Sequence, residues 1–141
     1  MRAIVVTIGR NIGSKPMPSD RWRLFKNHLQ QLVRAHGYTV TAANDGQGEW
    51  DDVPEANHVV VGVDFSDDQA SSSVLRLRAA LSLLAERHSQ DAIALIADGH
   101  SDLITGEYST YLDELNAAEA IGEREGNPID ARSAAHLASR A

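Results

Sequence analysis

The chain of 141 residues is 43% hydrophobic and 23% charged, which suits one compact unit long enough to bury a substantial core. It contains no cysteine, which excludes thiol catalysis, disulfides and thiolate metal sites, and we expect a reducing, cytoplasmic location. The net charge of −7 argues against a nucleic-acid partner, and the lack of an apolar run of about 20 residues argues against a membrane span.

The first part of the chain predicts a strand, a loop and a helix. Residues 2–8 place aliphatic side chains on both faces, as in a central strand that is covered on both sides. Glycines and prolines mark residues 9–18 as a loop. Ser19 can cap a helix, and apolar residues at three- and four-residue spacing from Trp22 onwards predict a helix that ends at Gly37.

Three further strands and one further helix are expected before residue 100. β-branched residues predict a strand over residues 38–43, and valines on both faces predict a central strand over residues 58–65. Residues 44–48 have the composition of a turn, so the two strands should form a long hairpin. A wide apolar stripe predicts a helix over residues 74–88, and a strand follows over residues 91–98.

The C-terminal region, residues 101–141, differs in composition from the rest of the chain. A helix is expected from about Ser109, with Gly122 and the Gly-Asn-Pro run at 126–128 ending it. A last helix is expected over residues 129–140. Neither helix has a strong apolar stripe, so we expect this region to be an extension that packs on the sheet or on a partner subunit.

The predicted order of elements over residues 1–100 is β-α-β-β-α-β, which is that of the ferredoxin-like α+β fold. This fold has an antiparallel sheet with two helices on one face, and its first and third strands are central, which agrees with their two apolar faces. The other face of the sheet would then be open unless a second subunit or residues 101–141 cover it. A three-layer α/β nucleotide-binding fold is the alternative, in which the helices fall on both faces.

Charge is strongly segregated along the sequence. Seven of the thirteen basic residues lie in the first 36 positions, where Asp20 is the one acid, so this segment carries +6 and the remainder −13. The segment includes a glycine-bearing loop and a helix start, which can present N–H groups and cations to one anion. It lacks the phosphate-binding P-loop and dinucleotide motifs. The residues proposed to bind an anionic ligand there are Arg10, Asn11, Lys15, Arg21 and Arg23.

The alternative for this segment is that its basic side chains pair with acids from the other part of the chain. The same question arises for Trp50, next to Glu49 in the predicted hairpin. Its indole could stack on a planar ligand such as a base, whereas the alternative is a packing anchor. Glu49 and His58 form a further candidate acid–base pair, although nothing in the sequence brings them together.

A candidate metal site follows the fourth predicted strand. If the chain stays extended there, Asp98, His100 and Asp102 point the same way, and two carboxylates with an imidazole suit a divalent metal ion. The alternative is a polar turn in which Asp98 accepts a local backbone hydrogen bond. No serine lies in a nucleophile-elbow context, and no catalytic residue or cofactor is predicted.

Four short motifs resemble a known pattern over residues 2–100: Gly9-Arg10-Asn11, the helix start Met17-Pro18-Ser19-Asp20-Arg21-Trp22 with Phe25, Gly37-Tyr38-Thr39-Val40, and Gly46 and Gly48 with Trp50. This pattern is similar to that of uncharacterised small ferredoxin-like proteins of actinobacteria and their phages. The resemblance implies a compact cytoplasmic accessory protein, phage-encoded and dimeric, that binds a host factor or sequesters a host signal.

Three functional hypotheses follow from the sequence. The first is a non-enzymatic, homo-oligomeric protein that binds an anionic small molecule, best a nucleotide, through its basic segment. The second is an interaction or assembly subunit whose basic segment docks on the acidic segment of a neighbour. The third is a metal-assisted hydrolase built on Asp98, His100 and Asp102.

Overall fold

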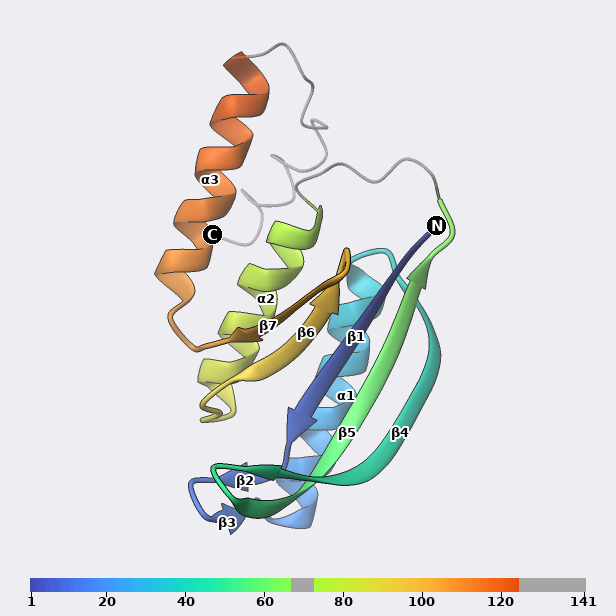
Figure 1. Cartoon of the computed structure of the whole chain (residues 1–141), viewed down its shortest axis with the longest axis vertical. Coiled ribbons are helices and arrows are strands. Elements are labelled where there is room, and N and C mark those ends of the chain that lie inside the picture. Colours follow the sequence, from blue (N-terminus) through green and yellow to red (C-terminus); the bar gives the residue numbers. More distant parts are fainter. Residues whose placement is uncertain (67–72, 125–141) are drawn as a thin grey trace.

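The computed structural model describes residues 1–66 and 73–124 (Figure 1). Five strands form one antiparallel sheet in the order β4-β5-β1-β6-β7, and two very short strands, β2 and β3, pair beside it. The elements in chain order are β1 (Arg2–Gly9), β2 (Asn11–Ile12), β3 (Lys15–Pro16), α1 (Ser19–Ala35), β4 (Thr39–Trp50), β5 (Val53–Asp64), α2 (Ser73–Arg87), β6 (Ile93–Ala97), β7 (His100–Ile104) and α3 (Tyr108–Arg124).

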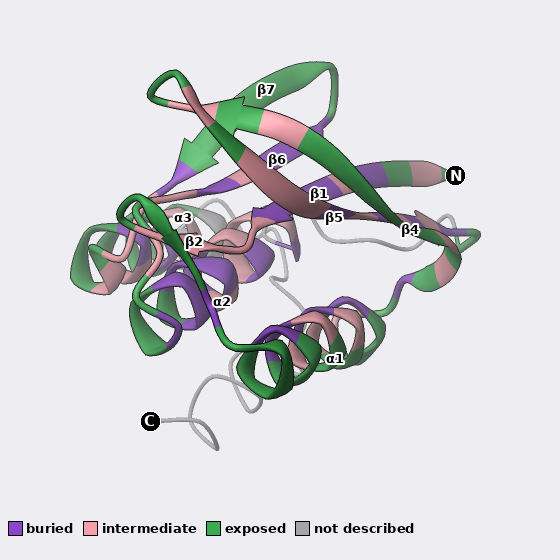
Figure 2. Cartoon of the chain, turned by 90° about the horizontal axis from the view of Figure 1, so that it is seen from below, coloured by how far each residue is buried: buried purple, intermediate pink, exposed green. Residues whose placement is uncertain are grey.

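The predicted ferredoxin-like α+β architecture is confirmed. β1 lies between β5 and β6, so the first strand and the second strand of the hairpin are central, as their apolar pattern predicts. The helices α1, α2 and α3 lie in one layer on one face of the sheet (Figure 2). The three-layer alternative, with helices on both faces, is therefore not the fold of the described residues.

The core fills the space between the sheet and its helices. β1 buries Ile4, Val6 and Ile8 on the helix side, while α1 buries Phe25 and Leu29 against them. Each fully buried side chain of this size stabilises the fold by roughly 1.5–3 kcal/mol relative to exposure. The helical spacing of these α1 residues is the pattern from which the sequence predicts the helix.

The hairpin of β4 and β5 is longer than the sequence predicts. Residues 44–48, expected to form the turn, continue β4 in register with β5, and Trp50 pairs with Val53. The turn itself is Asp51-Asp52, both with positive φ (50° and 61°), as in the two-residue turns that match strand twist. Because β4 is an edge strand, its turn-type residues are tolerated there and do not end the strand.

The chain after β6 also differs from the expectation. Asp98 and Gly99, both with positive φ, make a tight turn into β7, a fifth strand that the sequence does not predict. The chain does not stay extended through Asp98, as the predicted metal site requires. α3 begins one residue before the expected Ser109 and runs past Gly122. The predicted break at 126–128 and the last helix over 129–140 lie outside the described residues.

No described element covers the second face of the sheet, because α3 packs beside α2 in the helix layer and not on that face (Figure 2). This face includes Val61, Val5 and Ile96, which are direct neighbours across three strands. Ile96 is 47% exposed and Leu103 51% exposed. Among the described helices, none combines the length and apolar character needed to cross a membrane.

Candidate functional site

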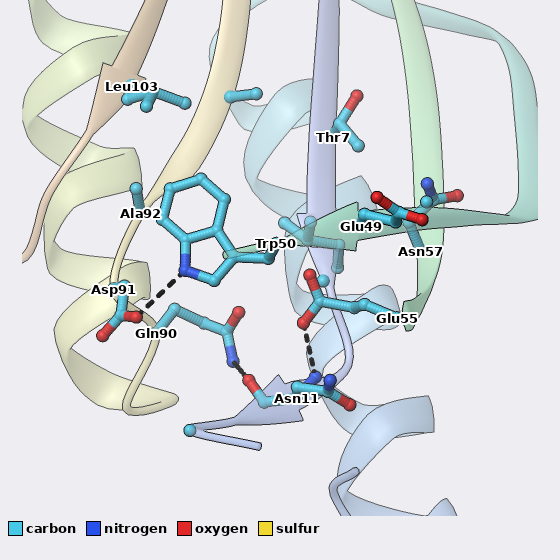
Figure 3. A pocket seen from close by; sticks show the side chains of 15 residues that line it. Thr7, Asn11, Glu49, Trp50, Glu55, Asn57, Gln90, Asp91, Ala92 and Leu103 are labelled. Atoms are coloured by element: carbon cyan, nitrogen blue, oxygen red, sulfur yellow. Dashed lines mark hydrogen bonds between the residues drawn. The ribbon is translucent and has the colours of Figure 1, made fainter. Parts of the chain in front are cut away.

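A pocket of about 190 Å³ lies on the helix-free face of the sheet, where β1 ends (Figure 3). Its floor is formed by one row of the sheet, in which Thr7 of β1 pairs with Ala94 of β6, and Ala94 pairs with Leu103 of β7. Its walls are the tip of the β4–β5 hairpin, the start of β2 and the segment between α2 and β6. The wall residues that line it are Gly9, Asn11, Gly13, Gly48, Glu49, Trp50, Glu55, Asn57, Gln90, Asp91 and Ala92.

Trp50 closes one side of the pocket. The hairpin extends beyond the end of β1, so its tip can reach across to the segment between α2 and β6. There the Trp50 indole Nε1 donates a hydrogen bond to Asp91 Oδ2 at 3.1 Å. The indole thus forms a pocket wall between two segments that are distant in sequence, as Figure 3 shows.

Glu55 is the carboxylate most closely held in the pocket. Its Oε2 accepts a hydrogen bond from the backbone N–H of Asn11 at 2.8 Å. Burial raises the pKa of the Glu55 carboxyl, the Asn11 hydrogen bond opposes this shift, and the nearby charge of Asp91 adds to it. A carboxyl in a pocket with a raised pKa is a candidate functional group, because its proton affinity is tuned away from that of a surface acid.

Asn11 joins the walls of the pocket to one another. Besides its N–H contact with Glu55, its side-chain Nδ2 donates to the carbonyl of Pro54 at 3.2 Å, and its own carbonyl accepts a hydrogen bond from Gln90 Nε2 at 3.1 Å. One residue of β2 is therefore bonded both to the hairpin and to the segment after α2. This network holds the segments around the mouth of the pocket together, and the backbone N–H of Gln90 is anchored in turn to the carbonyl of Ala85 in α2 at 2.9 Å.

The charge of the pocket is negative. Its lining includes three carboxylates, Glu49, Glu55 and Asp91, and no lysine, arginine or histidine. The remaining polar groups, on Thr7, Asn57 and others, are hydrogen-bonding and uncharged. Carboxylates beside an aromatic ring suit a neutral or positively charged planar ligand, because both the carboxylates and the face of the indole attract cations.

Of the ligand-binding residues predicted from the sequence, Asn11 and Trp50 line this pocket. The four predicted cations do not. Arg10 donates from Nε to the carbonyl of Met17 at 2.9 Å and from Nη2 to Ser19 Oγ at 3.3 Å, so it braces the loop that leads into α1. Arg23 lies 3.9 Å from Asp20 on the exposed surface of α1.

Lys15 and Arg21 are also exposed, on β3 and α1 respectively. Neither lines the pocket, and Arg21 acts electrostatically on His88 at the end of α2. The structure therefore brings two of the six predicted ligand-binding residues to one pocket and leaves the cations outside it.

Asp98, His100 and Asp102 lie around a second, more open pocket of about 500 Å³ between β6–β7 and α2. Asp102 forms an ion pair with Arg78 of α2, and Arg78 also lies 3.7 Å from Glu114 of α3. Within residues 1–66 and 73–124, no group of three or more histidine, aspartate or glutamate side chains is arranged to hold a metal ion. Asp102 therefore serves to join the sheet to the helices.

The candidate acid–base pair is separated. Glu49 lines the first pocket, whereas His58 is buried on the helix side of the sheet. His58 Nδ1 lies 2.8 Å from Asp45 Oδ1, and its Nε2 lies 3.1 Å from Gln30 Nε2. The hydrogen bond with His58 lowers the pKa of Asp45, which also pairs with Lys26. This cluster links α1 to the hairpin, and its residues line neither of the two pockets described above.

Sequence reasoning missed Glu55, Asn57, Gln90 and Asp91 as pocket residues. The one local signal was the glycine at the end of β1: a Cβ at Gly9 would collide with the Glu55 carboxylate. Glu55 itself lies in a segment with no motif. Its role depends on pairing between β4 and β5 beyond the end of β1, which the sequence alone does not specify.

Comparisons with known proteins place the fold. No protein-family model matches the chain, and no curated protein matches it. Two solved structures are similar: a phage SAM lyase in complex with S-methyl-5'-thioadenosine and a phage SAM lyase in the apo state. Both have a TM-score of 0.52 and are 17% identical to this chain. The match to the complex covers 76% of this chain and 91% of the lyase chain, and the match to the apo structure covers 75% and 90%. This likeness shows the shared fold.

Proposed function

We propose that this chain binds an adenosine-containing sulfonium compound, S-adenosylmethionine, in the pocket closed by Trp50, and cleaves it as a lyase. The observation that carries the proposal is the charge of the pocket, with Glu49, Glu55 and Asp91 beside an indole and no basic side chain. Its placement on a fold shared with a phage SAM lyase supports the same ligand class.

The charge favours this ligand over a phosphorylated nucleotide. A phosphate in the pocket would meet three carboxylates and no cation, whereas a sulfonium or ammonium group would be attracted. The adenine ring has the planar shape that an indole recognises by stacking. The anionic ligand expected from the basic segment is therefore replaced, in this proposal, by a cationic nucleoside derivative.

Glu55 is the proposed reactive-site carboxylate. S-methyl-5'-thioadenosine retains the adenosine, the sulfur and the methyl group of S-adenosylmethionine, so a lyase that forms it breaks the bond between the sulfur and the amino-acid chain. The electron pair of that bond goes to the sulfur, which becomes neutral, while the carboxylate of the same amino-acid chain bonds to the released carbon and closes a lactone, so the step balances without a co-reactant. A partly buried carboxylate fixed by the Asn11 N–H is suited to orienting the cationic substrate for this step.

Incubation with S-adenosylmethionine tests the proposal, with S-methyl-5'-thioadenosine measured by chromatography. The wild type should form it, and Glu55→Gln should reduce the rate by about 10-fold or more, since a charge-assisted contact contributes roughly 1.5–3 kcal/mol. Glu107→Gln, an exposed acid in the segment before α3, is the matched control. The proposal fails if no product forms and calorimetry detects no binding of either compound.

Two other outcomes of this experiment are informative. Binding of S-adenosylmethionine without turnover would favour a sequestering protein over an enzyme. Binding of ATP, abolished by replacing Arg10 or Lys15, would favour the nucleotide hypothesis based on the basic segment.

We further propose that a second copy of the chain covers the open sheet face. That face presents Val5, Val61 and Ile96 without a charged side chain among them, and an uncharged patch can pack against its own copy. Ile96→Glu should shift the sedimentation coefficient to that of a monomer, whereas Leu24→Glu, on the exposed surface of α1, should not. A wild-type monomer at micromolar concentration contradicts this and favours a host protein as the occupant.

A phage origin and a cytoplasmic location belong to the same proposal. The sequence pattern resembles proteins of actinobacteria and their phages, and the proposed substrate is an intracellular metabolite. The absence of cysteine agrees with a reducing compartment.

A further inference from the structure

Gly9 and Glu55 lie against each other at the end of β1. A Cβ built on Gly9 would fall in hard contact with the carboxylate carbon and both carboxylate oxygens of Glu55. The φ of Gly9 is not in the left-handed region, so its conformation alone does not require glycine. Glycine is required at this position because the Glu55 carboxylate occupies the space that a side chain would fill.

The same carboxylate is held from the other side by β2. Asn11 N–H donates to Glu55 Oε2 at 2.8 Å, and the Asn11 carbonyl is itself fixed by Gln90 Nε2 at 3.1 Å. The peptide that carries this N–H is held by its own carbonyl, on Arg10, which accepts a hydrogen bond from the backbone N–H of Met17 at 2.9 Å. Gln90 restrains Asn11 from its other side, through the peptide that follows it. Gly9 and Asn11 thus lie against the Glu55 carboxylate, and Gln90 is linked to it through Asn11. Figure 3 shows the chain of hydrogen bonds from Gln90 to Asn11 and from Asn11 to Glu55.

We infer that Gly9 and Gln90 are positioning residues for the reaction: Gly9 leaves the space in which the Glu55 carboxylate faces the pocket, and Gln90 holds, by its carbonyl, the residue Asn11 whose N–H fixes the carboxylate there. This inference rests on the proposed function of the pocket. It assigns a role to two residues that carry no reactive group of their own.

Gly9→Ala should move the carboxylate without unfolding the chain. The colliding atoms are at the far end of a flexible side chain, so the new methyl group can displace them by rotation. The displaced carboxylate then leaves the Asn11 N–H and becomes hydrated. The other titratable groups that face it are Glu49 of β4 and Asp91 of the segment before β6, and both are unchanged by the substitution.

The first measurement does not depend on any ligand. NMR titration of the 13C-labelled Glu55 carboxyl should show its pKa lowered in Gly9→Ala relative to the wild type, because relief of the desolvation that raises the pKa outweighs loss of the Asn11 hydrogen bond that lowers it. Gly106→Ala is the control, since a Cβ there meets Glu86 at ordinary contact distance, 3.5 Å. Equal Glu55 pKa values in the wild type and Gly9→Ala, with equal turnover, would overturn the inference.

The second measurement uses S-adenosylmethionine turnover. Gly9→Ala should lower kcat/KM by about 10-fold and Gln90→Leu by about 3-fold, with Gln31→Leu on the exposed surface of α1 as control. A double-mutant cycle separates positioning from general damage. Glu55→Asp shortens the side chain, so adding Gly9→Ala to it should cost less than Gly9→Ala costs the wild type.

Additive effects of Glu55→Asp and Gly9→Ala in that cycle would count against the inference, even if Gly9→Ala is itself poorly folded. If Gln90→Leu turns over substrate as fast as the wild type, Gln90 is not a positioning residue. A lowered Glu55 pKa in Gly9→Ala, together with no turnover by the wild type, would retain the positioning role and reject the proposed reaction. The two failures are therefore distinguishable.

Discussion

Trp50 Nε1 donates a hydrogen bond to Asp91 Oδ2 at 3.1 Å, and these two residues are separated by 41 positions in the chain. Trp50 lies at the tip of the β4–β5 hairpin, and Asp91 lies between α2 and β6. The contact bridges the open edge of the pocket, so an element of the sheet and the segment after a helix together define its entrance. A hairpin that stopped at the end of β1 would leave the pocket without this wall.

Trp50→Phe should keep the aromatic wall and lose the bridge. We expect the affinity for S-methyl-5'-thioadenosine to fall by about 3-fold, since an exposed hydrogen bond to a carboxylate contributes at the low end of its range, about 1 kcal/mol or less. Calorimetry measures the affinity. The indole N–H of Trp50 should also exchange faster with solvent in Asp91→Ala, with the buried Trp22 as the internal reference; an unchanged exchange rate would contradict the bridge.

We expect the fold to lose stability in acid because of the buried side chain of His88. It is 4% exposed and stacks on Phe25, and burial, with the charges of His28, Arg21 and Arg87, lowers its pKa from 6.5 to about 4. Above pH 6.5 it is neutral in both the folded and the unfolded chain. Between pH 6.5 and 4 only the unfolded chain binds the proton, so the free energy of unfolding should fall by up to about 3 kcal/mol.

Urea denaturation at pH 7, 5.5 and 4 measures this loss. His88→Phe retains a ring beside Phe25 and removes the titrating group, so its stability should depend less on pH over this range. His100→Phe, at an exposed position of β7, should leave the pH dependence as in the wild type. Equal pH dependence in the wild type and His88→Phe would show that His88 is not the group responsible.

The fold was largely predictable because its determinants are local. The three- and four-residue spacing of apolar side chains specifies α1, and two apolar faces specify β1 and β5 as central strands. The hairpin turn was not predictable from composition, because Asn44 to Gly48 carry the residues of a turn but pair along β5. Pairing with a long neighbouring strand outweighed the local preference.

The pocket was less predictable because it is built from distant segments. Asn11 and Trp50 were identified on local grounds, whereas Glu55, Gln90 and Asp91 enter only through long-range hydrogen bonds. The charge asymmetry of the sequence pointed to an anion site, but Arg10 binds backbone and hydroxyl oxygens of its own loop. The number of charges in a segment does not predict which groups each guanidinium contacts.

Gly62 should be sensitive to the smallest substitution. A Cβ there would lie 2.9 Å from Val33 Cγ1, 3.0 Å from Tyr38 Cβ and 3.2 Å from Ile4 Cγ1, all packed parts of the core between β5 and α1. Gly62→Ala should therefore lower the free energy of unfolding by about 1–3 kcal/mol, the usual cost of overpacking. Urea denaturation beside Gly106→Ala measures it, and equal stability of the two variants would indicate that α1 can move away from the sheet.

Asp102 provides the last test, because it is a candidate metal ligand in the sequence and the structure pairs it with Arg78. The Arg78 guanidinium, 21% exposed, also lies over the Tyr111 ring at 5.3 Å and near Glu114, so it ties β7 to α2 and α3. Asp102→Asn should lower the free energy of unfolding by about 1 kcal/mol, as for a partly exposed ion pair.

Asp98→Asn is the matched control for that variant, since asparagine also accepts the positive φ of this turn residue and should leave stability unchanged. Addition of Zn²⁺ or Mn²⁺ should leave the melting temperature of the wild type unaltered, because the Asp102 carboxylate is engaged by the guanidinium. Stoichiometric metal binding that raises the melting temperature and is lost in both Asp98→Asn and Asp102→Asn would instead restore the metal site and, with it, the hydrolase hypothesis.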